Sequence, residues 1–147
     1  MAEIRHRVGI RGSAAEIYAL LTTDSGLSKW WTSNTRGAGQ VGSIIEFRFG
    51  DYGPDFTVVE LIPKRLVRWR HSGDIPEDWK GSEISFELDE DKDQTIVNFS
   101  HYNWPKSDAF LAHCSTKWGV FMMSLKSCIE TGKGQPWPDD VHIDFDE

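Results

Sequence analysis

The chain has 147 residues, of which 39% are hydrophobic and 27% are charged, and its formal net charge is −7. This length and composition predict one globular domain, and they exclude a disordered chain. The excess of acidic residues disfavours nucleic acid and anionic membrane surfaces as partners, because both carry negative charge. The N-terminal residues lack an apolar signal segment, and no apolar run is long enough to span a membrane, so we expect a cytoplasmic protein.

The N-terminal part of the chain predicts a strand followed by two short helices. Apolar side chains alternate over Glu3–Ile10, which is typical of a strand with one buried face. Ser13 and Glu16 have the spacing of a capping box, and Asp24 can cap a second helix that ends in a pair of tryptophans. The polar, glycine-rich residues 33–42 that follow predict a mobile loop.

The middle of the chain predicts more strands, and the C-terminal part predicts one long helix. Alternation over five segments joined by short turns indicates antiparallel strands at Ser43–Phe49, Phe56–Ile62, Arg65–His71, Ser82–Leu88 and Thr95–Tyr102. A long amphipathic helix is expected over residues 108–131, ended by Gly132. Cys114 and Cys128 both fall on this helix, too far apart for a disulfide, so we expect two buried thiols.

Together these elements predict an α+β fold in which a curved antiparallel sheet of about six strands grips the long helix. The apolar stripe of the helix then faces the apolar face of the sheet, and a curved sheet can leave a cavity between them. Residues 1–134 form the expected single domain. Residues 135–147, which are rich in proline and aspartate, form an acidic tail.

Four segments, in this order and spacing, resemble a known family. They are Ser13–Thr23, Gly26–Thr32, Pro63–Trp69 and Ser124–Gly134. On these segments the chain resembles the START-like (SRPBCC) superfamily, and within it the group named after the activator of heat-shock protein 90 ATPase. The resemblance implies the helix-grip fold. The superfamily includes lipid carriers, polyketide cyclases, hydrolases and co-chaperone domains, so the resemblance implies no single function.

The inward-facing side chains of the sheet and long helix predict the lining of a cavity whose mouth lies near residues 33–42. A pocket for a small hydrophobic molecule, such as a lipid, and a core filled by the same rings both fit this pattern. His101 is the best polar candidate, but the sequence shows no partner for acid–base catalysis, so no catalytic residue is assigned. The candidate ligand-binding residues are Trp31, Phe47, Phe49, Val58, Trp69, His71, Phe86, Phe99, His101, Phe110, Cys114, Trp118, Phe121 and Met122.

No spacing in the sequence is typical of a metal site or a nucleotide loop, so no metal and no cofactor is expected. The basic cluster could dock an acidic partner, although a solvated face is the simpler interpretation; the cluster consists of Lys64, Arg65, Arg68 and Arg70. We therefore expect a protein that carries a small apolar molecule and catalyses no reaction. The alternatives are a chaperone-associated interaction module and an enzyme of the cyclase or dehydratase type. The ligand and the oligomeric state stay open.

Overall fold

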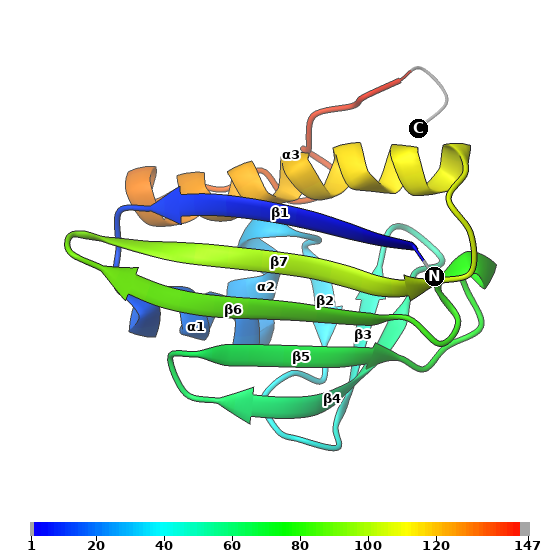
Figure 1. Cartoon of the computed structure of the whole chain (residues 1–147), viewed down its shortest axis with the longest axis horizontal. Helices are drawn as coiled ribbons and strands as arrows, with labels where there is room; N and C mark the ends of the chain where they lie inside the picture. The colour runs from blue at the N-terminus through cyan, green and yellow to red at the C-terminus, as the bar shows by residue number, and fades with distance from the viewer. Residues whose placement is uncertain (1, 145–147) are drawn as a thin grey trace.

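In the computed structural model, which describes residues 2–144, seven strands form one antiparallel sheet beside three α-helices (Figure 1). The strands are β1 (Ala2–Ile10), β2 (Asn34–Arg36), β3 (Ile44–Arg48), β4 (Asp55–Ile62), β5 (Leu66–His71), β6 (Glu83–Asp91) and β7 (Gln94–Trp104). The helices are α1 (Ala14–Thr22), α2 (Asp24–Trp30) and α3 (Ala109–Thr131), with a short 3-10 helix, η1 (Glu77–Trp79).

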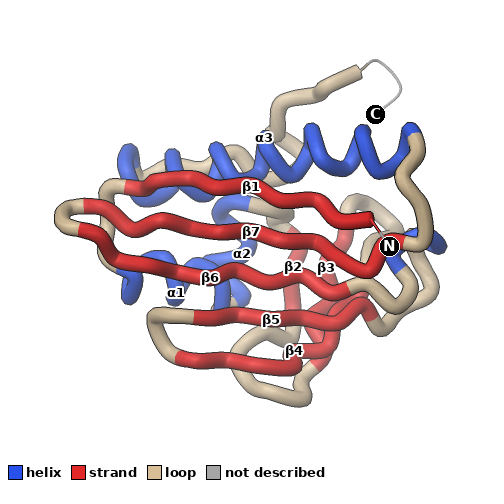
Figure 2. Tube along the Cα trace, viewed as in Figure 1, coloured by secondary structure: helices blue, strands red, loops and turns tan. Residues whose placement is uncertain are grey.

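The strand order β1-β7-β6-β5-β4-β3-β2 and the long helix confirm the predicted α+β helix-grip fold. Figure 2 shows the sheet curving round α1 and α2, with α3 running alongside β1. A seventh strand arises because Asn34–Arg36 pairs with β3 across Glu46–Arg48. The prediction of a mobile loop over 33–42 is therefore wrong for these three residues, where Thr35 is buried and donates to the Thr32 carbonyl at 2.9 Å.

The two short helices begin at hydrogen-bonded caps. Ser13 and Glu16 form the predicted capping box: each backbone amide donates to the other side chain at 3.1 Å. At α2 the cap is Thr23 rather than the predicted Asp24. The Thr23 Oγ1 accepts the Gly26 amide at 3.0 Å. The Asp24 carboxylate instead accepts the Ala38 amide at 2.8 Å, which ties the glycine-rich turn to the start of the helix.

Both ends of α3 confirm the predicted helix over 108–131. Asp108 caps the N-terminus, where its carboxylate accepts the amides of Phe110 and Leu111 at 3.1 and 3.2 Å. Gly132 ends the helix in the left-handed conformation, with φ of 82°, which residues bearing a Cβ rarely adopt. Within residues 2–144, no helix has the length and apolar character needed to cross a membrane.

Aromatic rings fill most of the space between the sheet and the helices. Trp69 in β5 is fully buried, and its ring centroid lies 5.2 Å from that of Phe86 and 5.4 Å from that of Phe47. Further along the sheet, Phe99 in β7 contacts Trp118 of α3 with centroids 4.6 Å apart. The middle of the sheet–helix interface is therefore packed core.

Candidate functional site

Two adjoining cavities of about 530 and 200 Å³ lie at the end of the molecule where α3 begins. The smaller is lined by Trp31, Phe49, Trp79, Phe110, His113, Cys114, Lys117, Trp118 and Phe121. The larger shares most of these residues and extends to three segments, 49–54, 75–79 and 137–142. The lining is mainly apolar, and the larger volume falls within the range of small-molecule sites, roughly 300–1,000 Å³.

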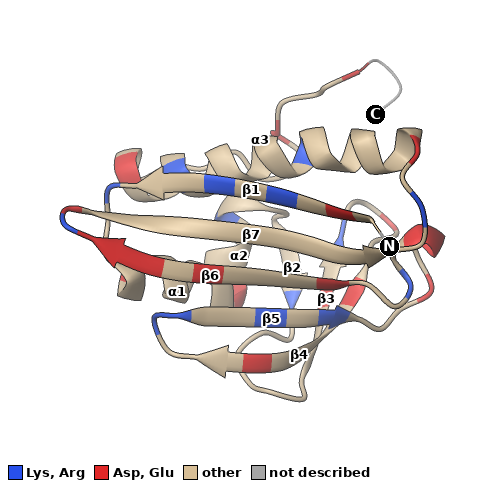
Figure 3. Ribbon diagram, in the orientation of Figure 1, with Lys and Arg blue, Asp and Glu red and all other residues tan. Residues whose placement is uncertain are grey.

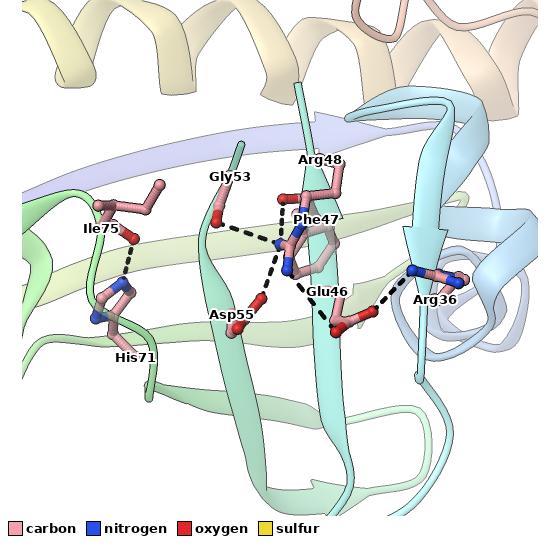
Figure 4. Close-up of polar contacts among 8 residues, drawn as sticks. All are labelled: Arg36, Glu46, Phe47, Arg48, Gly53, Asp55, His71 and Ile75. Carbon is pink, nitrogen blue, oxygen red and sulfur yellow. Dashed lines mark hydrogen bonds and ion pairs between the residues drawn. The ribbon is translucent and has the colours of Figure 1, made fainter. Parts of the chain in front are cut away.

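Residues 49–54, the turn between β3 and β4, form one wall and are held by Arg48 (Figure 4). The Arg48 Nη1 donates to the carbonyls of Phe47 and Gly53, at 3.1 and 3.2 Å, and to Asp55 Oδ1 at 2.8 Å. A guanidinium that binds both ends of a turn in this way stabilises the conformation of the turn. The apolar side chains of the turn are thereby fixed against the cavity.

The second wall, residues 75–79, is held by His71 (Figure 4). His71 is buried at the end of β5, and its Nε2 donates to the Ile75 carbonyl at 2.8 Å. Its Nδ1 is buried without a hydrogen-bond partner among residues 2–144. Burial lowers the pKa of His71 below its usual value, which favours the neutral ring with its hydrogen on Nε2. His71 therefore positions this wall from behind and does not line the cavity.

Residues 137–142 form the third wall. The Trp137 amide donates to the Trp31 carbonyl at 2.7 Å, and the Trp137 carbonyl accepts the Ser33 amide at 3.2 Å. Asp140 is buried and forms an ion pair with Lys117 of α3. These contacts hold the segment against α2 and α3, so part of the predicted tail belongs to the lining of the cavity.

The structure brings some of the predicted site residues to the cavities and places the rest in the core. Those on the lining are Trp31, Phe49, Phe110, Cys114, Trp118 and Phe121. Those away from it are Phe47, Val58, Trp69, His71, Phe86, Phe99, His101 and Met122, all of them buried. The reason is ring size, because the aromatic side chains contact one another across the sheet and fill the expected pocket.

The lining of the larger cavity bears on the predicted mouth near residues 33–42. None of residues 33–42 lines the larger cavity, which lies between 49–54, 75–79 and 137–142. The start of the 33–42 segment is nevertheless adjacent, because the Ser33 amide donates to the carbonyl of Trp137 at 3.2 Å. Periodicity misses Trp79, in the three-residue helix η1, and Trp137, in the segment after α3, because neither segment is long or regular enough to show a repeating apolar pattern. One signal was available: a tryptophan in a polar, proline-rich stretch has a large apolar ring that favours packing over water.

His101 lies fully buried within a chain of hydrogen bonds. Trp118 Nε1 donates to His101 Nδ1 at 3.3 Å, and His101 Nε2 donates to Ser82 Oγ at 2.8 Å. The Ser82 hydroxyl in turn donates to the Trp79 carbonyl at 2.6 Å. Burial lowers the pKa of His101 to about 3. A neutral ring with both nitrogens engaged is poorly suited to acid–base work, and the chain instead holds η1 and α3 against β7.

Cys114 lines the cavity, and its thiol is expected to react slowly. Burial raises the pKa of Cys114 to about 12, so very little reactive thiolate exists at neutral pH. Cys128 is only partly buried. We expect iodoacetamide to modify Cys128 first and Cys114 only after unfolding, as measured by peptide mass spectrometry. Equal rates in the native protein would show that the cavity opens far more readily than this structure indicates.

Charged side chains on the outer face of the sheet are largely paired, and Figure 3 shows basic positions on β5 beside acidic ones on β6. Arg68 contacts Glu60 and Glu83, and Arg70 contacts Glu83 at 3.1 Å. This pairing supports a solvated face for Arg68 and Arg70, because the charges offset one another. Lys64 and Arg65, at the turn before β5, have no ion pair among residues 2–144. In the described part of the chain, no group of three or more His, Cys, Asp or Glu side chains is placed to hold a metal ion.

Known proteins provide an independent comparison. Residues 11–130 match the family described as activator of Hsp90 ATPase homolog 1-like protein. The solution structure of the Aha1 dimer from Colwellia psychrerythraea is 54% identical, covers 91% of this chain and 100% of that chain, and superposes with a TM-score of 0.85. No curated protein matches the chain.

Two more distant structures share the fold alone. Protein SSP2350 from Staphylococcus saprophyticus is 15% identical over 90% of this chain and 95% of that chain, with a TM-score of 0.75. DynU16, from the dynemicin biosynthetic locus, is 20% identical over 90% of this chain and 48% of that chain, with a TM-score of 0.73. Because the family match spans most of the helix-grip domain, the chain belongs to the activator of Hsp90 ATPase homolog 1-like family.

Proposed function

We propose that this protein binds a small hydrophobic molecule in the paired cavities at the N-terminal end of α3. The observation that carries this proposal is the mainly apolar, aromatic-lined cavity of about 530 Å³. A mainly apolar hollow of this size, lined by three separate segments and open to solvent, has the character of a small-molecule site. A second hollow, of about 780 Å³ beside the turn between β4 and β5, is lined in part by charged side chains and suits a hydrophobic ligand less well. We further propose a cytoplasmic location, because Cys114 and Cys128 are both free thiols.

Native mass spectrometry of freshly purified protein tests the proposal first, since a tightly held ligand would add a discrete mass. Binding of a neutral fluorescent probe, N-phenyl-1-naphthylamine, tests it a second way. Phe110 lines both cavities and is 36% exposed, so its truncation should spare the fold. We expect Phe110→Ala to weaken probe binding about tenfold, which corresponds to about 1.4 kcal/mol of lost apolar contact.

Met123→Ala is the matched control for this experiment. Met123 lies on the same helix, is 53% exposed and does not line the cavities. We expect it to leave probe affinity unchanged. Equal losses in the two variants, or no probe binding by the native protein, would contradict a ligand site at this end of the molecule.

A second candidate function is suggested by exposed apolar side chains around the mouth of the cavity. Tyr52, Ile75 and Val141 are 67%, 42% and 51% exposed. These three exposed apolar side chains can contact a protein partner as well as a ligand. Since the family is named for activation of the Hsp90 ATPase, the direct test is the rate of ATP hydrolysis by purified Hsp90 with and without this protein. Stimulation that is lost in Tyr52→Ser would favour the interaction module.

A further inference from the structure

We propose that the ligand of these cavities is a cation, namely an aromatic or apolar amine. This inference rests on the proposed function and adds the charge of the ligand. It follows from three features of the site: unpaired acids that flank the cavity lining in sequence, a buried carboxylate oxygen on the lining that lacks a partner, and aromatic rings beside it. Each feature is described in turn below.

Four acidic residues that flank the cavity lining in sequence lack an ion-pair partner among residues 2–144. They are Asp51, Asp74, Asp78 and Asp139, each next in sequence to a residue that lines the larger cavity. The nearby lysines are already neutralised, because Lys80 pairs with Glu77 at 3.1 Å and Lys106 with Asp108 at 3.5 Å. The local field is therefore negative, and it attracts cations and repels anions.

Asp140 brings a carboxylate to the lining itself. Its side chain is 3% exposed, and its Oδ2 is bound to Lys117 Nζ. Its Oδ1 is buried and has no hydrogen-bond partner among the described residues. A buried carboxylate oxygen without a donor is unfavourable. Oδ1 has almost no exposed surface, so a ligand N–H group removes that cost when the carboxylate turns towards the cavity. An ammonium group supplies both the donor and the matching charge.

Aromatic faces complete the arrangement. The Lys117 ammonium lies 5.3 Å from the centre of the Phe121 ring, so this lining already holds one cation against an aromatic face. The rings of Trp79 and Trp118 stack with their centroids 6.3 Å apart, and both residues line the smaller cavity. An anionic ligand would instead have to compete with Asp140 for Lys117, which also donates to the Val141 carbonyl at 3.0 Å.

A matched series of probes tests the charge of the ligand. The probes are 1-naphthylmethylammonium, 1-naphthylmethanol and 1-naphthoate, which share one ring system and differ in charge. Titration calorimetry at low ionic strength should show the cation binding about tenfold more tightly than the neutral alcohol, and the anion most weakly. Added salt should reduce the difference in affinity between the cation and the other two probes, because it screens the charges of the acidic residues beside the cavity.

Asp140→Asn is the variant that tests the carboxylate. We expect it to weaken binding of the cation about tenfold and to leave the neutral alcohol unchanged. Asp91→Asn, which removes the same charge from the distant end of β6, should change neither affinity. If Asp140→Asn weakened the affinity for all three probes equally, Asp140 would act by holding the third wall in place. That result would overturn its role in binding the cation.

The outcomes separate this inference from the proposed function. If the three probes bind equally well, the cation preference is wrong, while the cavity remains a binding site. If the anion binds best, Lys117 rather than Asp140 selects the ligand and the inference is overturned. If none of the probes binds, and native mass spectrometry finds no ligand, the proposed function fails and the inference fails with it.

Discussion

Trp69→Ala is expected to lower the free energy of unfolding by about 3–5 kcal/mol. The Trp69 ring is fully buried in β5 and is surrounded by the rings of its neighbours, with that of Phe56 centred 5.8 Å away and that of Trp31 stacked at 6.3 Å. Removing the indole would leave a void that these interlocked rings cannot close. Urea denaturation followed by circular dichroism measures the change.

The control for this measurement is Met123→Ala, at a position that is 53% exposed, for which we expect a loss below about 1 kcal/mol. A similarly small loss for Trp69→Ala would mean that the concave face of the sheet is open rather than packed. The ligand cavity would then extend to the middle of the sheet, as the sequence pattern alone allowed.

The second large effect is a loss of stability as the pH falls below the ordinary histidine range. An unfolded histidine has a pKa near 6.5, whereas burial lowers that of His101 to about 3 in the folded protein. The folded state therefore favours the neutral ring. The resulting contribution of His101 to the free energy of unfolding is fully present above about pH 6.5 and declines towards pH 3. Between about pH 7 and 5, we expect a loss of about 2 kcal/mol from this residue.

His101→Gln isolates this contribution, because glutamine keeps a donor and an acceptor but does not titrate. Its urea stability should fall less between about pH 7 and 5 than that of the native protein. Part of the dependence should remain, since burial also lowers the pKa of His71. The carboxylates with lowered pKa values, Glu16 and Glu130, contribute only below this window. An identical pH dependence in both proteins would contradict a neutral, buried His101.

The fold was predictable because local signals and tertiary packing agree. The capping box at Ser13 and Glu16, the αL glycine at 132 and the alternation in β5 to β7 each specify local structure, and each is confirmed. β4 shows where such reasoning fails. A register shift between Val58 and Glu60 interrupts its pairing with β5, so strict alternation does not hold along the strand.

The candidate site was predictable only in part. The sequence placed Trp118 and Phe121 on the inner stripe of α3, and both line the cavities. It could not show that the rings of the sheet would fill its centre and leave an aromatic-lined cavity where α3 begins, because that depends on their combined volume. Nor could it show that Asp140, beyond the last helix, would return to pair with Lys117. Such a contact depends on the path of an irregular segment, which has no periodic signal.

The distribution of tryptophans gives the protein an internal optical reporter. Trp31, Trp79, Trp118 and Trp137 line the cavities, whereas Trp30, Trp69 and Trp104 are fully buried in the core. A ligand that enters the site would lie against the first group and leave the second unperturbed. The intrinsic fluorescence of the unlabelled protein should therefore change when a ligand binds, through the indoles that line the cavities. Replacing Trp137 with phenylalanine would separate the signal of the third wall from that of Trp31, Trp79 and Trp118.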